Sequence, residues 1–61
     1  MIYDKVKQLC SKKCITFAQI ERWADVSNGT IASWIKSDPK ISTVKKVAKA
    51  LNVEVAELLE D

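Results

Sequence analysis

The chain has 61 residues, of which 48% are hydrophobic and 30% are charged. This length allows one domain, spanning residues 1–61, and the mixture is too apolar for a disordered chain. No stretch approaches the roughly 20 apolar residues of a membrane-spanning helix, and early charged residues interrupt any secretory signal. We therefore expect a globular, cytoplasmic protein with no membrane partner.

Residues that usually carry catalysis or bind metals are scarce. Histidine is absent, which removes the commonest general base and a common metal ligand. Cys10 and Cys14 lack further soft ligands nearby, so a closed zinc site is not expected within one chain. A cytosolic setting favours free thiols, with Cys10 a small buried hydrophobe. A redox disulfide between them is the alternative, because four residues of helix separate their Cα atoms by about 6 Å. The composition argues against an enzyme, a metal site, a cofactor or a small-molecule ligand.

Charge is distributed unevenly along the chain. Ten basic and four acidic residues precede residue 54, whereas the last eight residues hold four acids and no base. The acids of this tail are Glu54, Glu57, Glu60 and Asp61. A basic body suits a polyanionic partner, and a generic solvated surface is the alternative.

Two amphipathic helices are predicted in the N-terminal half. Apolar residues at helical spacing predict the first over about residues 2–12. Thr16 and Gln19 have the spacing of a capping box, so a second helix is expected over about residues 16–24. The apolar stripe of the first helix is Ile2, Val6 and Leu9, and that of the second is Ile20 and Ala24.

A bend and a third helix follow. Asp25 tolerates the left-handed conformation, and Val26 can fill the inside of the bend. Ser27 is a candidate N-cap. We therefore expect a three-residue turn and then a helix over about residues 28–36. Its predicted buried stripe is Ile31, Trp34 and Ile35, which makes Trp34 a core residue rather than one that stacks on bases.

The C-terminal half predicts a loop and two further helices. Pro39 marks the loop, and Ser42 is the expected cap of the fourth helix. Asn52 suits a left-handed C-cap and separates the fourth helix from a short fifth one. The predicted buried stripe of the fourth helix is Val44, Val47, Ala48 and Leu51, and the apolar residues that predict the fifth helix are Val53, Val55, Leu58 and Leu59. The fold class predicted from these elements is all-α, a compact five-helix bundle.

Two helices joined by a short turn inside such a bundle are typical of a helix-turn-helix. In that motif the second helix enters the DNA major groove and its N-terminal residues contact base edges. Asn28 can pair bidentately with adenine, and free N–H groups at the helix start can bind phosphate. An ordinary polar helix start is the alternative. The candidate base contacts are Ser27, Asn28, Gly29, Thr30 and Ser33.

From about Lys5 to Leu59 the chain resembles the phage-repressor (Cro/cI, or XRE-type) helix-turn-helix family. The resemblance rests on the order and spacing of several residues together. They are Ile20, Ala24, Val26, residues 27–31, Trp34, Pro39, residues 44–53, Leu58 and Leu59. It implies a lambda-repressor-like bundle that binds double-stranded operator DNA, usually as a homodimer. The expected function is therefore a sequence-specific transcriptional regulator, namely a phage or bacterial repressor.

The chain departs from the family pattern at several positions. Glycine is usual in the family where this chain has Cys14, Asp25 and Asn52, and cysteine is the poorest substitute in a left-handed position. A phosphate-binding glutamine is common where Phe17 stands, and alanine where Glu21 stands. Glu21 would weaken DNA binding if it faced DNA and would be neutral if it paired with a lysine.

Phosphate contacts are expected instead from residues that flank the motif, although simple solvation of each lysine is the alternative. These residues are Thr16, Lys36, Lys40 and Thr43. A protein-binding module without DNA recognition is the rival function, motivated by Phe17, Glu21 and Trp23. Trp23 marks either a partner surface or a cover over the first helix. The candidate dimer surfaces are Trp23 or the C-terminal residues Val55, Leu58 and Leu59.

Overall fold

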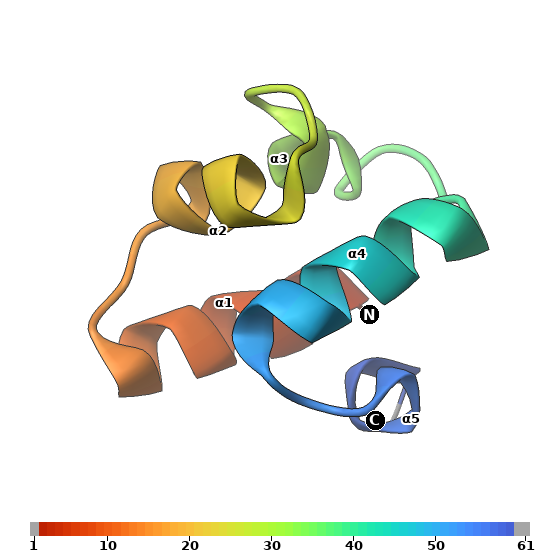
Figure 1. The fold of residues 1–61 in the computed structure, drawn as a ribbon. Coiled ribbons are helices and arrows are strands. Elements are labelled where there is room, and N and C mark those ends of the chain that lie inside the picture. Colours follow the sequence, from red (N-terminus) through yellow and green to blue (C-terminus); the bar gives the residue numbers. More distant parts are fainter. Residues whose placement is uncertain (1, 60–61) are drawn as a thin grey trace.

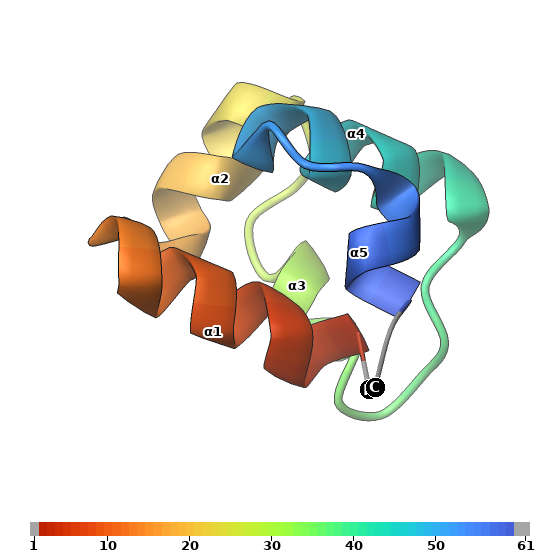
Figure 2. The ribbon, with the colours of Figure 1, turned by 90° about the horizontal axis from the view of Figure 1, so that it is seen from below.

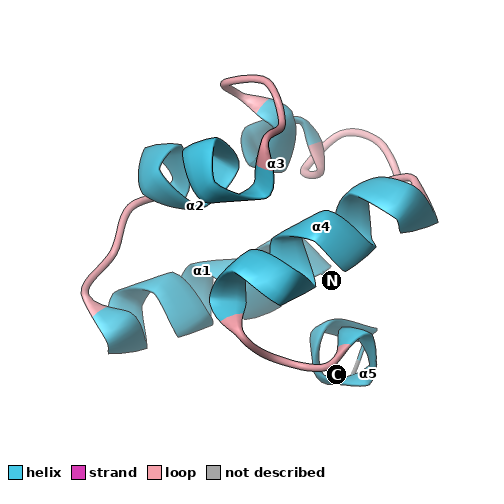
Figure 3. Ribbon diagram, in the orientation of Figure 1, coloured by secondary structure: helices cyan, strands magenta, loops and turns pink. Residues whose placement is uncertain are grey.

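The computed structural model describes residues 2–59, and within them the chain forms five helices and no strand (Figures 1 and 3). The helices are α1 (Ile2–Lys13), α2 (Phe17–Ala24), α3 (Thr30–Ser33), α4 (Ile41–Leu51) and α5 (Val55–Leu59). The prediction of an all-α, five-helix architecture is confirmed. Within these residues no helix has the length and apolar character needed to cross a bilayer. Glu60 and Asp61, which belong to the acidic tail, lie outside the described residues.

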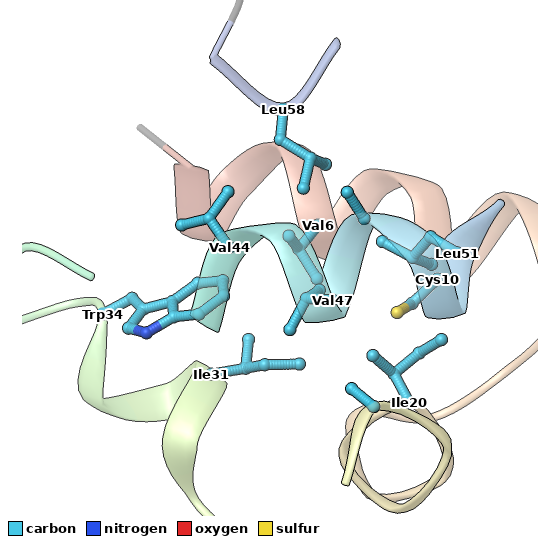
Figure 4. Packing of buried hydrophobic residues seen from close by; sticks show 11 residues of the cluster. Val6, Cys10, Ile20, Ile31, Trp34, Val44, Val47, Leu51 and Leu58 are labelled. Carbon is cyan, nitrogen blue, oxygen red and sulfur yellow. The ribbon is translucent and has the colours of Figure 1, made fainter. Parts of the chain in front are cut away.

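The helices pack around a shared interior. α2 packs on α4, α3 contacts α2, and α5 contacts both α1 and α4. Figure 2 shows α5 closing one end of the space between α1 and α4. The interior consists of Val6, Cys10, Ile20, Ala24, Ile31, Trp34, Val44, Val47, Ala48, Leu51 and Leu58 (Figure 4). Every helix therefore contributes apolar side chains to one core.

Two sequence interpretations of core residues are confirmed. Trp34 is 5% exposed and lies beside Val44 and Ile31, so it is a core residue (Figure 4). Cys10 is buried, and this burial raises the pKa of its thiol. Cys14 is exposed and both cysteines are free. Cys10 therefore serves as a small hydrophobic side chain with a protonated thiol. The two cysteines form no disulfide with each other.

Two predictions about local structure are wrong. Ile35, expected in the core, is 54% exposed. The N–H groups of Ile35 and Lys36 each donate to the carbonyl three residues back, whereas an α-helix uses the carbonyl four residues back. The α-helix has therefore ended before Ile35, and the helical periodicity that would bury this residue no longer holds. Ser42 is not the cap of α4, because Lys40 occupies that position in extended conformation and makes no side-chain cap bond. The Lys40 carbonyl accepts the first helical N–H bonds, which leaves Ser42 inside the helix.

Left-handed residues end three of the helices. Cys14, Asp25 and Asn52 have φ angles of 58°, 60° and 60°. At each, the residue's own N–H donates to the carbonyl three residues back, and the next N–H donates five residues back. This pair of bonds is the Schellman arrangement, which satisfies carbonyls at the end of a helix. All three positions are those where the family resemblance leads one to expect glycine.

Replacement of Cys14 by glycine should stabilise the protein, because Cys14 is the left-handed residue least able to hydrogen-bond its own backbone. We expect Cys14→Gly to raise the free energy of unfolding by about 1 kcal/mol. Urea and thermal denaturation measure this change, which corresponds to a rise in Tm of about 4–8 °C in a small domain. Asn52→Gly should gain less, because asparagine tolerates a positive φ.

Cys14→Ala serves as the control, because it removes the thiol and keeps the Cβ atom that disfavours the left-handed conformation. If the alanine variant were as stable as the glycine variant, the gain would come from loss of the thiol and not from relief of backbone strain.

Candidate nucleic-acid interface

The side chain of Glu21 fixes the start of α3. Glu21 belongs to α2 and is 4% exposed. Its Oε1 accepts the N–H of Gly29 at 3.1 Å, and its Oε2 accepts the N–H of Ile31 at 3.0 Å. We call these two hydrogen bonds the Glu21 clamp. Carboxylate oxygens are strong acceptors for the otherwise unpaired N–H groups that begin a helix. The clamp therefore joins the two helices of the motif directly.

Neither role that the sequence suggested for Glu21 describes it. The side chain does not face outward toward DNA, and in the described part of the chain its hydrogen-bond partners are backbone N–H groups rather than a lysine. A buried carboxyl needs such partners, because an unsatisfied one is costly. The signal was present in the sequence: Glu21 follows buried Ile20 and precedes buried Ala24 by three residues, which places it on the inner side of α2.

The turn between α2 and α3 is longer than predicted. It spans residues 25–29, five residues instead of three, and α3 covers Thr30–Ser33 instead of residues 28–36. Ser27 is not a side-chain cap: its backbone carbonyl accepts from the N–H of Thr30 at 3.2 Å and from the Thr30 hydroxyl at 2.6 Å. The helix starts late because the Glu21 clamp takes over the capping that Ser27 was expected to supply.

Gly29 is the residue immediately before α3, and its φ of 86° is left-handed. Glycine adopts this conformation without the steric cost that a Cβ atom brings. The space around its Cα is open, so glycine is needed here for its backbone angle and not for lack of room. Since the clamp engages the N–H groups of Gly29 and Ile31, the expectation that they are free for phosphate is wrong.

The five candidate base-contact residues lie together on and after this turn. Ser27, Asn28, Gly29 and Ser33 are exposed, and Thr30 is half-buried. The Ser33 hydroxyl donates to the Thr30 carbonyl at 2.6 Å. Thr30 donates its own hydroxyl to Ser27, so both hydroxyls keep only their acceptor capacity. The Asn28 side chain makes no hydrogen bond within residues 2–59, so its amide keeps both donor and acceptor groups.

Buried side chains hold this exposed segment from below. Ile31 is fully buried, Trp34 is nearly so, and Val26 is half-buried against the core at the inside of the turn. These apolar residues and the Glu21 clamp hold the side of the segment that faces the core, so residues 27–30 are attached to the core on that side. We call residues 27–29, which precede α3, the exposed turn.

The candidate phosphate contacts flank the exposed turn in the amino-acid sequence, with one before it and three after it. Lys36 and Lys40 are exposed in the segment between α3 and α4, together with the acidic Asp38. Thr43 is half-buried in the first turn of α4. Thr16 caps α2: its hydroxyl oxygen accepts the Gln19 N–H at 3.1 Å, and the Gln19 side chain accepts the Thr16 N–H at 2.9 Å. The capping box predicted from the sequence is confirmed.

Phe17 and Trp23 have different surroundings. Phe17 is half-buried and meets Tyr3 of α1 edge-to-face, with ring centroids 5.6 Å apart and an interplanar angle of 74°. Trp23 is 56% exposed and lines a hollow with residues of α4, so it does not serve as a cover over α1. Phe17 thus packs two helices together, while Trp23 leaves an aromatic surface open.

The exposed turn lies apart from the surface hollows of the described residues. Within residues 2–59 no three histidine, cysteine, aspartate or glutamate side chains are grouped so that they could bind a metal ion. Two hollows on the described surface lie along α4, and the exposed turn lines neither of them. The polar side chains of the exposed turn thus lie on the open surface, outside both hollows.

The chain is similar to a known family of DNA-binding domains over most of its length. A model described as the Cro/C1-type HTH DNA-binding domain matches residues 5–61, nearly the whole chain. No curated protein and no solved structure matches the chain.

Removal of the Glu21 clamp should destabilise the protein. We expect Glu21→Ala to lower the free energy of unfolding by about 2 kcal/mol, because two N–H groups lose their acceptors and one of them is buried. Glu21→Gln keeps one carbonyl acceptor and should lose roughly half as much. Urea denaturation measures the loss, and hydrogen exchange should accelerate at the amides of Gly29 and Ile31.

Glu54→Ala is the matched control, because it removes the same charge from an exposed position and should stay within about 0.5 kcal/mol of wild type. Equal stability of the Glu21→Ala and Glu54→Ala variants would show that the clamp contributes nothing to the fold.

Proposed function

The chain belongs to the Cro/C1-type helix-turn-helix DNA-binding family, and from that membership we propose that it is a sequence-specific transcriptional regulator of double-stranded DNA. The finer proposal is a phage or bacterial repressor that acts in the cytoplasm by occupying an operator. In a helix-turn-helix the start of the second motif helix meets base edges in the major groove. The corresponding element here is α3 with the exposed turn before it.

The proposal rests mainly on the exposure of Asn28 and on the free hydrogen-bonding groups of its side-chain amide. This residue is exposed, its amide is unbonded within the described residues, and it stands on a turn fixed by the Glu21 clamp. An asparagine amide can accept from and donate to one adenine edge at once. We propose Asn28 and Ser33 as the main base contacts, with Ser27, Gly29 and Thr30 close to the groove.

We propose phosphate contacts from Lys36, Lys40, Thr43 and Thr16. The two lysines supply charge, and the two threonines supply hydroxyl groups at the starts of α2 and α4. Such contacts set affinity and register but carry no sequence information. Phe17 cannot add a polar contact of this kind, because its ring packs on Tyr3.

A homodimer on DNA is the proposed active form, because a single small module buries too little DNA for high specificity. Binding to two half-sites would place the α3 helices of the two copies about 34 Å, one turn of DNA, apart. Of the C-terminal candidates for the dimer surface, Leu58 is unsuitable because it is buried in the core, whereas Leu59 is 55% exposed.

The rival function is a protein-binding module that keeps the bundle without DNA recognition. Two of its three motivating residues, Glu21 and Phe17, have roles inside the fold. Trp23 still favours it, because a tryptophan that is 56% exposed in a small domain can mark a partner surface. Salt-dependent binding to duplex DNA distinguishes the two, since neutralised phosphates release counterions.

Substitutions of Asn28 and Lys40 should have different effects on DNA binding. Asn28→Ala should weaken binding to the preferred duplex by about 10- to 100-fold and leave binding to mixed-sequence DNA nearly unchanged. Lys40→Ala should weaken binding to all duplexes alike and reduce the slope of log affinity against log salt by about one. Fluorescence anisotropy over a series of salt concentrations measures both quantities.

Lys7→Ala is the control, because it removes an exposed lysine of α1 and should change neither quantity. A salt slope near zero for the wild-type protein would overturn the proposal and favour the protein-binding module.

A further inference from the structure

A hollow of about 420 Å³ lies between α2 and α4, away from the exposed turn. Its lining consists of Trp23, Ala24, Lys46, Lys49 and Ala50. Ala24 is buried, Ala50 is half-buried, and Trp23 is more than half exposed. The hollow therefore has a small apolar floor and one large aromatic wall. We call it the Trp23 hollow.

The charged lining of the Trp23 hollow has one sign. Lys46 and Lys49 are both exposed and lie one turn apart on α4. No acidic residue of the described chain lines it. A second hollow, which shares Lys49, differs in this respect, because Glu54 and Glu57 line it together with Lys45. The Trp23 hollow is thus the one of the two whose positive charge has no counter-charge in its lining.

This surface is separate from the proposed DNA contacts. Lys40 and Thr43 stand at the start of α4, and Lys46 follows Lys40 by six residues, about 9 Å along a helix axis. Ala50 lies near the other end of α4. A ligand in the Trp23 hollow can therefore be bound while the first turn of α4 faces phosphate.

We propose that the Trp23 hollow binds an acidic peptide segment of a partner protein, with one apolar side chain of that segment resting against Trp23. Carboxylates of the segment would pair with Lys46 and Lys49, and the apolar side chain would cover Ala24 and Ala50. Tryptophan is among the residues that contribute most at protein interfaces. A single-stranded nucleic acid fits less well, because it needs successive aromatic platforms and the hollow has one.

DNA binding by this regulator would then be controlled by a partner protein that contacts the side of the molecule away from DNA. A partner that supplies such a segment could bind the regulator on its operator. The interaction should weaken as salt is added, as DNA binding does, because lysines attract carboxylates here and phosphates there.

Nuclear magnetic resonance with the isotope-labelled full chain tests this inference. The probe is a short synthetic peptide of glutamates around one phenylalanine. We expect shifts at the indole N–H of Trp23 and the amides of Ala24, Lys49 and Ala50, with the indole of buried Trp34 unchanged. Trp23→Ala and Lys46→Glu should each weaken peptide binding by about tenfold or more.

Lys45→Glu is the matched control, because it makes the same charge change at the neighbouring residue, which lines the other hollow. It should weaken the peptide far less than Lys46→Glu does. A control peptide with alanine in place of phenylalanine should bind about tenfold more weakly. Addition of duplex DNA should leave the peptide bound.

Four results would overturn the inference. They are absence of peptide binding, equal weakening by Lys45→Glu and Lys46→Glu, displacement of the peptide by duplex DNA, and tighter binding of a single-stranded oligothymidine than of the peptide.

Sedimentation of the protein alone provides a further check. A dimer that is lost in Trp23→Ala would assign the hollow to a second copy of the chain. Failure of DNA binding with peptide binding intact would affect the proposed function alone.

Discussion

The proposed DNA-binding surface depends on the two hydrogen bonds that the Glu21 carboxylate accepts from the start of α3. They replace the side-chain cap that a polar residue at the helix start ordinarily supplies. Because the acceptor comes from the buried face of α2, the polar side chains of the exposed turn are not needed for capping. Asn28 in particular keeps its hydrogen-bonding groups for a partner. The same carboxyl thus stabilises the fold and leaves the surface free.

The backbone of α2 supports the same turn. Asp25 is left-handed, and the N–H of Val26 donates to the Glu21 carbonyl at 3.0 Å. Glu21 therefore contacts the turn through its main chain and the next helix through its side chain. Gly29, also left-handed, completes the path into α3. Below this polar framework, Ile31 and Trp34 insert into the core, so the turn is fixed from both its backbone and its buried side (Figure 4).

Sequence periodicity was sufficient for α1, α2, α4 and α5, because each buries a stripe of apolar residues at regular spacing. The left-handed ends at Asp25 and Asn52 were predictable from residue type, and the capping box at Thr16 from a local motif. The start of α3 was not predictable in this way. Its cap comes from Glu21, eight residues before Gly29, and such a contact depends on tertiary packing rather than on local preference. Ile35 was misplaced for a related reason, since periodicity assumes that the helix continues. The base-contact residues remain predictions, because a structure of the protein alone does not contain the groove that they would read.

We propose that the Glu21 clamp presents a turn that reads DNA sequence. The decisive experiment is the selection of bound duplexes from a random pool, with wild type, Glu21→Gln and Glu21→Ala in parallel. Wild type and Glu21→Gln should enrich the same near-palindromic motif, and Glu21→Ala should enrich it only weakly, at a temperature where all three are folded. Absence of any enriched motif with the wild-type protein would show that the turn reads no sequence, and an equally sharp motif with Glu21→Ala would show that the clamp is not required for that reading.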